Sequence, residues 1–167
     1  TDGDATVAES GAIIEFLVER HGQSALVPAA GTPERLRYTY WLHFAEGSAM
    51  PPLVMALVFS KIKKAPMPFF ARPIAREISA KVKGSFIDPN LRLHLDYLEA
   101  ELARGEWFTG PEFTAADIQL SFPIELARVR AGLDESRPRL MAFLRRIHAR
   151  PAYQAALRAA GDYSLLR

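Results

Sequence analysis

The stretch FTAADIQLSFP, residues 113–123, contains the clearest helix start in the chain. Thr114 and Asp117 have the spacing of a capping box, in which the threonine hydroxyl accepts from a backbone N–H three residues on and the acid accepts from the N–H of the threonine. We therefore predict a helix over residues 114–131, with Pro123 inside it. The box stabilises a helix end, so we assign Thr114 and Asp117 to folding rather than to chemistry.

Most of the chain after residue 33 also has the apolar spacing of helices. Pro51 and Pro52 should kink or restart the helix that begins at Pro33, and residues 63–73, KKAPMPFFARP, read as a proline-rich joint. The fold class is therefore mainly α. Besides the helix over 114–131, the expected helices cover residues 33–50, 74–84, 89–105 and 137–149, and a last short one begins at Pro151.

The first 22 residues have a different pattern. Residues 5–8 read as the end of a strand, and an amphipathic helix follows from Ser10. Residues 22–33, GQSALVPAAGTP, then form a connector in which Leu26 is the main aliphatic anchor. A domain rarely begins by completing a hairpin, so we interpret residues 1–22 as the end of a domain whose beginning precedes Thr1.

The composition argues against several functions. Lys and Arg number 21 and Asp and Glu number 19, so the net charge of +2 does not point to nucleic acid. The chain has no cysteine, and His21, His94 and His148 have no metal-ligand spacing, so we expect no metal. The longest uncharged stretch, residues 47–60, contains two prolines and is too short to cross a bilayer, so we expect no membrane span.

Three segments resemble one protein family. TVAESGAIIEFL, residues 6–17, resembles the end of the thioredoxin-like domain of glutathione S-transferases, where a Glu/Gln-Ser pair joins a strand to a helix. FTAADIQLSFP resembles the motif that starts the central helix of the helical C-terminal domain in the same superfamily. YWLHFAEGSAMPPLV, residues 40–54, resembles a bacterial and fungal subgroup of these proteins.

The resemblance covers essentially all 167 residues and implies three parts. Residues 1–22 would be the C-terminal remnant of a thioredoxin-like, glutathione-binding α/β domain, contributing its last strand and helix. Residues 23–32 would be a linker, and residues 33–167 an all-helical C-terminal domain. The Ser, Tyr or Cys that activates glutathione would precede Thr1, so no catalytic residue is expected in this chain.

The implied activity is conjugation of the glutathione thiolate to a hydrophobic electrophile, in detoxification, by a cytoplasmic homodimer. Glutathione would be a co-substrate, with no metal and no nucleic acid involved. Two alternatives remain open. One is a glutathione-dependent disulfide reductase or isomerase on the same fold, and the other is a non-catalytic transferase-like binding module.

Glu9 and Ser10 are the first candidate binding residues. A serine hydroxyl and exposed N–H groups at a helix start can hold a carboxylate, and a neighbouring glutamate can hold an amino group. The γ-glutamyl end of glutathione has both groups on one carbon. Helix capping by Ser10, with Glu9 favouring the helix dipole, would explain the same two residues.

The segment 40–54 supplies the remaining candidates. Glu46 resembles the acid that in several transferase classes reaches the glutathione amino group of the partner subunit. His43 lies three residues before it and would share its helix face. His43 and Met50 could line an apolar pocket for the electrophile, although a core histidine and a solvated glutamate would fit the same pattern.

Overall fold

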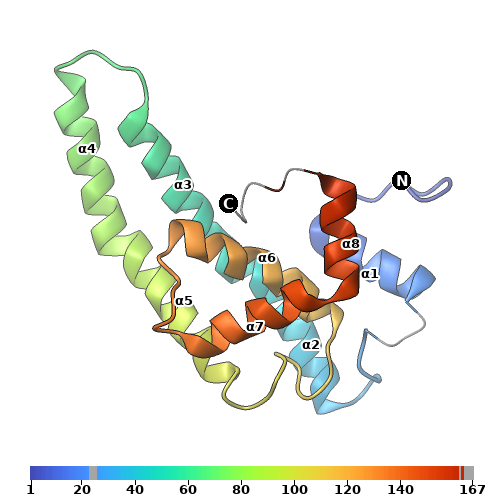
Figure 1. Cartoon of the computed structure of the whole chain (residues 1–167). Coiled ribbons are helices and arrows are strands. Elements are labelled where there is room, and N and C mark those ends of the chain that lie inside the picture. Colours follow the sequence, from blue (N-terminus) through green and yellow to red (C-terminus); the bar gives the residue numbers. More distant parts are fainter. Residues whose placement is uncertain (23–25, 162, 164–167) are drawn as a thin grey trace.

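The computed structural model describes residues 1–22, 26–161 and 163, and most of them are helical (Figure 1). The mainly α fold class is confirmed. The elements, in chain order, are α1 (Ser10–His21), α2 (Pro33–Phe44), the π-helical turn η1 (Ala45–Ala49), α3 (Met50–Lys64), α4 (Ala71–Val82), the π-helical turn η2 (Lys83–Ile87), α5 (Asp88–Glu101), α6 (Ala115–Arg130), α7 (Pro138–Ala149) and α8 (Pro151–Ala160).

The strand predicted at residues 5–8 is not formed. Ala5 makes only an isolated bridge with Asp2, and among the described residues no other segment pairs with residues 6–8. A strand is held by hydrogen bonds to a neighbouring strand, so an extended pattern alone does not produce one. The helix predicted after it is present as α1.

Helix α6 is the centre of the fold, because it contacts α1, α2, α3 and α7. The core beside it contains an aromatic chain in which Trp41, Phe108 and Phe143 meet with ring centroids 4.9 Å and 5.1 Å apart. The connector before α2 is tied to the same centre, since the carbonyl of Leu26 accepts from the N–H of Ala115 at 2.9 Å. Residues 23–25 of the expected linker lie outside the described residues.

Both π-helical turns lie just before prolines. η1 precedes Pro51 and Pro52, and η2 precedes Pro89. A proline has no N–H to donate to the carbonyl four residues back, so the helical hydrogen bonds change register there. The kink predicted at Pro51 is therefore a register change within one continuous helix, Pro33–Lys64.

That continuous helix is long and apolar enough, by length and composition alone, to cross a membrane. Core helices meet the same criterion, and here Trp41, Leu42 and Leu53 are buried against the rest of the fold. The absence of a membrane span therefore stays a prediction.

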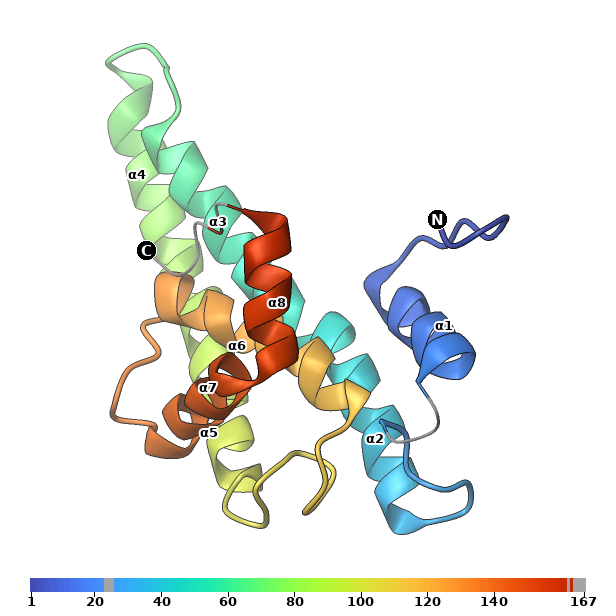
Figure 2. The same cartoon turned by 45° about the vertical axis from the view of Figure 1, so that its right-hand side comes forward.

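Helices α3 and α4 form an antiparallel hairpin that projects from the body of the molecule (Figures 1 and 2). Residues 65–70, inside the predicted proline-rich joint, form its tip. Helix α1 lies away from this tip, beside the stretch of the long Pro33–Lys64 helix where α2 leads into η1. The hairpin tip and the start of α1 are thus two separate regions of the molecule.

Candidate functional site

The start of α1 meets the π-helical turn η1 through a hydrogen bond. The Ser10 hydroxyl donates to Oε1 of Glu46 at 2.8 Å, across 36 residues of sequence. Two of the three predicted glutathione-binding residues are therefore brought together within one chain. From the resemblance, Glu46 is expected to reach the glutathione amino group of a partner subunit. Within one chain it already contacts Ser10, and the cross-subunit role remains a prediction.

A third residue, Gln119, completes this cluster from α6. Its amide Nε2 donates to the same Oε1 of Glu46 at 2.5 Å, and its side chain is buried at 5% exposure. Sequence reasoning missed Gln119, although a polar residue on the buried side of the helix that begins at Thr114 was a usable signal. The hydroxyl and the amide fix the position of the Glu46 carboxylate, while Glu46 itself remains exposed.

Glu9 has an unusual backbone conformation. Its φ is 72° and its ψ is 123°, and among the described residues no other non-glycine residue has a positive φ. Such a conformation costs on the order of 1–3 kcal/mol, and strained residues of this kind concentrate at functional sites. Glu9 is exposed at the entrance to α1, directly beside Ser10.

Helix capping does not account for the Glu9-Ser10 pair. Glu9 occupies the N-cap position of α1, Ser10 is already helical, and neither side chain makes a capping hydrogen bond in the described structure. The serine hydroxyl is directed to Glu46 instead. The first-turn N–H groups of α1 consequently have no side-chain cap, which is the arrangement found where helix N-termini bind anions.

His43 and Met50 are less well placed for the role expected of them. His43 is exposed on α2 and Met50 is half-buried at the start of α3. Neither lines the pocket between α3 and α4 or the apolar pocket beside α8. Their assignment to an electrophile pocket remains a prediction.

The capping box predicted at Thr114 and Asp117 is present in the structure. Asp117 is fully buried, and its Oδ2 accepts from the Thr114 N–H at 2.8 Å and from the Thr114 hydroxyl at 3.0 Å. Its Oδ1 accepts from the N–H of Phe108 at 3.0 Å, a bond that the sequence did not predict. Burial raises the pKa of Asp117, and these hydrogen bonds oppose that rise.

The sequence predicts that this protein binds no metal. Within the described residues, no group of three or more histidine, aspartate or glutamate side chains is arranged to hold a metal ion. The expectation of a metal-free site remains a prediction.

Comparison with known proteins points to one family. Residues 87–146 match the family model described as glutathione S-transferase, C-terminal domain. A glutathione S-transferase of Schizosaccharomyces pombe is 32% identical to this chain, and the alignment covers 98% of this chain and 67% of that relative. A glutathione S-transferase structure from Actinobacillus pleuropneumoniae matches with a TM-score of 0.73 and 26% identity, over 100% of this chain and 70% of that one.

A sphingomonad glutathione S-transferase solved in complex with glutathione has a TM-score of 0.71 and 27% identity, over 98% of this chain and 72% of its own. The chain spans about two thirds of the curated relatives that it matches, 67% of the fission yeast protein and 65% of one from Saccharomyces cerevisiae.

Proposed function

Because this chain belongs to the glutathione S-transferase superfamily, we propose that the protein binds glutathione and joins its thiolate to a hydrophobic electrophile. We also propose the division inferred from the sequence, in which residues 1–22 complete a thioredoxin-like domain. The apolar side chains of Ile13 and Leu17 are exposed on α1, as expected of a helix face that packs against such a domain. A cytoplasmic location and a role in detoxification are part of the same proposal.

The observation that carries the proposal is the cluster of Ser10, Glu46 and Gln119 beside the strained Glu9. The uncapped N–H groups of α1 suit the α-carboxylate of a γ-glutamyl group, and the Ser10 hydroxyl, which donates to Glu46 here, would turn to that carboxylate when glutathione binds. The carboxylates of Glu9 and Glu46 suit the α-ammonium group of the γ-glutamyl moiety, which is attached to the same carbon as the α-carboxylate. The sphingomonad relative was solved in complex with glutathione, which supports glutathione as the ligand.

The chemistry requires the thiolate of glutathione as the nucleophile. The thiolate sulfur forms a bond to an electrophilic carbon, and the leaving group departs with the electron pair of the bond that breaks. Residues of this chain would bind and orient the glutamyl end, which places the thiol near the electrophile. We assign the activation of the thiol to no residue of this chain.

Calorimetric titration of glutathione into the complete protein tests the binding site. Ser10→Ala and Glu9→Ala should each weaken binding by about 1–3 kcal/mol, because each removes a charge-assisted contact. Ser121→Ala is the matched control, since in the described part of the chain the Ser121 hydroxyl donates to the Ile118 carbonyl within its own helix. Unchanged affinity in both α1 variants would refute the assignment.

A pair of activity assays on the complete protein, which would include the thiol-activating residue that the proposal places outside this chain, tests the reaction. With 1-chloro-2,4-dinitrobenzene, conjugation replaces chloride by the glutathione sulfur and yields a coloured thioether. With a small disulfide such as hydroxyethyl disulfide, a reductase would instead oxidise glutathione. Turnover of the disulfide alone would replace conjugation by the reductase alternative, and binding of glutathione without either reaction would favour the non-catalytic module.

A further inference from the structure

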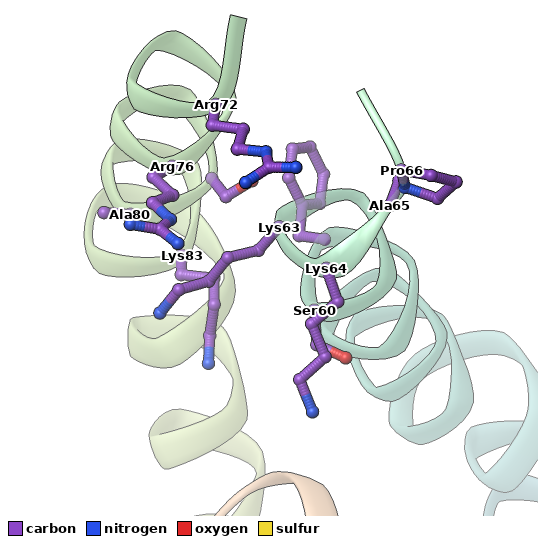
Figure 3. A pocket seen from close by; sticks show the side chains of 11 residues that line it. Ser60, Lys63, Lys64, Ala65, Pro66, Arg72, Arg76, Ala80 and Lys83 are labelled. Carbon is purple, nitrogen blue, oxygen red and sulfur yellow. The ribbon is translucent and has the colours of Figure 1, made fainter. Parts of the chain in front are cut away.

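A second polar site lies in the hairpin between α3 and α4, far from the glutathione residues proposed above (Figure 1). It is a pocket of about 650 Å³. Both helices contribute to its walls, as Figure 3 shows. The lining residues are Phe59, Ser60, Lys63, Lys64, Ala65, Pro66, Arg72, Arg76, Ser79, Ala80 and Lys83.

The lining contains five cations and no carboxylate. Lys63 and Lys64 come from the end of α3, Arg72 and Arg76 from α4, and Lys83 from η2. In Figure 3, Lys63 extends from α3 across the gap toward Arg76 and Lys83. Like charges gathered in one pocket repel one another, so this arrangement favours an anionic occupant.

Few interactions within the protein offset this charge. Lys83 approaches Asp88 at 4.0 Å, and the Nε of Arg72 donates to the Met67 carbonyl at 3.3 Å. Among the described residues, Lys63, Lys64 and Arg76 make no ion pair within 4.0 Å. Most of the pocket's positive charge is therefore not neutralised by the part of the chain that the structure describes.

Helix electrostatics explain only part of the cluster. Lys63 and Lys64 lie in the last turn of α3, where cations stabilise the helix dipole. Arg72 lies in the first turn of α4, where a cation is opposed by the dipole. The helix dipoles therefore do not explain why cations from α3 and from α4 converge on one pocket.

Ser79 supplies an independent observation. It lines the pocket from α4, its exposure is only 1%, and its Oγ has no hydrogen-bond partner in the described structure. Buried hydroxyls are nearly always hydrogen-bonded, and an unpaired one is costly. An anion in the pocket would provide the missing acceptor.

We propose that the α3–α4 pocket binds a phosphate-type anion. The guanidinium groups of Arg72 and Arg76 can bind phosphate oxygens in bidentate fashion, Lys63 and Lys83 add point charges, and Ser79 donates a hydrogen bond. The occupant is either a soluble phosphorylated compound or a phospholipid headgroup. A phospholipid is supported as the source by Phe69, at 82% exposure, and Phe70. Both lie at the hairpin tip beside these cations, where they could enter the acyl region of a membrane.

Titration of the full protein with pyrophosphate tests the anion site. The double variant Lys63→Gln/Arg76→Gln should weaken binding by roughly tenfold or more, because it removes two charge-assisted contacts. Ser79→Ala should weaken it by about threefold to tenfold with no change in charge. The matched control Arg128→Gln/Arg130→Gln removes the same charge from the end of α6, outside the pocket, and should bind as the wild type does.

Co-sedimentation with vesicles separates the two sources. The vesicles contain phosphatidylcholine with or without phosphatidic acid. A lipid occupant predicts binding only to the acidic vesicles, reduced by Lys63→Gln/Arg76→Gln and by Phe69→Ser/Phe70→Ser. A soluble occupant predicts pyrophosphate binding without vesicle binding. The proposal is overturned if neither probe binds, or if the Lys63→Gln/Arg76→Gln variant binds every probe as tightly as the α6 control.

Discussion

At the scale of single residues, the glutathione-binding candidates differ in how far the sequence could predict them. The Glu9-Ser10 pair was visible because two polar groups stand at a helix start. The bond from Ser10 to Glu46 and the contribution of Gln119 depend on how α1, η1 and α6 pack. No local pattern encodes that packing, so the geometry of the cluster could not be predicted from spacing alone.

Glu9→Gly should separate stability from binding. Glycine adopts a φ of 72° without steric cost, so this variant should be more stable to unfolding than Glu9→Ala by about 1 kcal/mol. Both variants should bind glutathione more weakly than the wild type. The comparison uses chemical denaturation and calorimetry. The control is Glu15→Gly, in the middle of α1, which should be less stable than Glu15→Ala by about 0.5–1 kcal/mol. Equal stability of the two Glu9 variants would mean that no strain is stored there.

Asp117→Ala should destabilise the fold by about 2–4 kcal/mol, because it leaves the buried N–H groups of Phe108 and Thr114 without an acceptor. Asp134→Ala is the matched control. Asp134 is exposed, and among the described residues its carboxylate accepts one backbone hydrogen bond, from Ser136, so loss of the side chain should cost at most about 1 kcal/mol. Thermal unfolding measures both variants. An Asp117→Ala protein that melts normally but has lost turnover would contradict the structural role.

At the scale of elements, the helices were predictable and the departures from regular helix were not. Apolar spacing and the positions of proline and threonine gave the helices, including the start of α2, where the Thr32 side chain accepts from the N–H of Arg35. Pro51 and Pro52 also predicted where the regular α-helix is interrupted, but not that the interruption takes the form of a π-helical turn. The strand at residues 5–8 failed because a strand requires a partner that its own sequence does not specify.

Helix α8 is held to α6 by a cluster that spacing did not indicate. Glu125, buried on α6, accepts from the hydroxyls of Tyr153 and Tyr163 at 2.6 Å and 2.8 Å, and its Oε1 also contacts Nε2 of His148 at 2.6 Å. Burial, and then the bond to Glu125, raise the pKa of both tyrosines. The neutral phenols are therefore favoured in the folded state.

The stability of α8 should consequently fall at alkaline pH. A pKa raised above the unfolded value of about 10 contributes stability that is complete below pH 10 and is lost as the pH rises toward the folded value. Denaturant titrations at pH 9 and pH 11 should show a larger loss for the wild type than for Tyr153→Phe, which has no phenol to ionise at that position. A loss of equal size in both proteins would show that Tyr153 does not contribute to the pH dependence.

At the scale of the whole molecule, the long helix has two apolar faces, one buried in its own chain and one exposed. Trp41 and Phe44 are buried in the core of their own chain. Leu36, at 74% exposure, and Tyr40 face outward with His43. The Trp41 ring lies 4.9 Å from that of Tyr40 and 5.4 Å from that of Tyr97 on α5, centroid to centroid. Tyr97 is partly exposed and Leu93, one turn before it on α5, is exposed, so the outward face of α2 continues onto α5. Exposed apolar side chains that share one face in this way are a candidate interaction site.

We expect a second copy of the chain to cover this face, because most soluble homo-oligomers close by two-fold symmetry and a helix face related to itself can pair in that way. Light scattering should give a dimer at micromolar concentration. Leu36→Glu would bury a charge at the centre of the contact, and the dimer should weaken by about tenfold or more. Val129→Glu is the control, because Val129 is an exposed aliphatic residue on α6 and its substitution introduces the same charge outside this face.

A wild-type monomer, or equal weakening of the dimer by both substitutions, would exclude an interface on α2. Glutathione affinity should survive in the Leu36→Glu monomer, because the single chain already brings Ser10 to Glu46; its loss would mean that the partner completes the site.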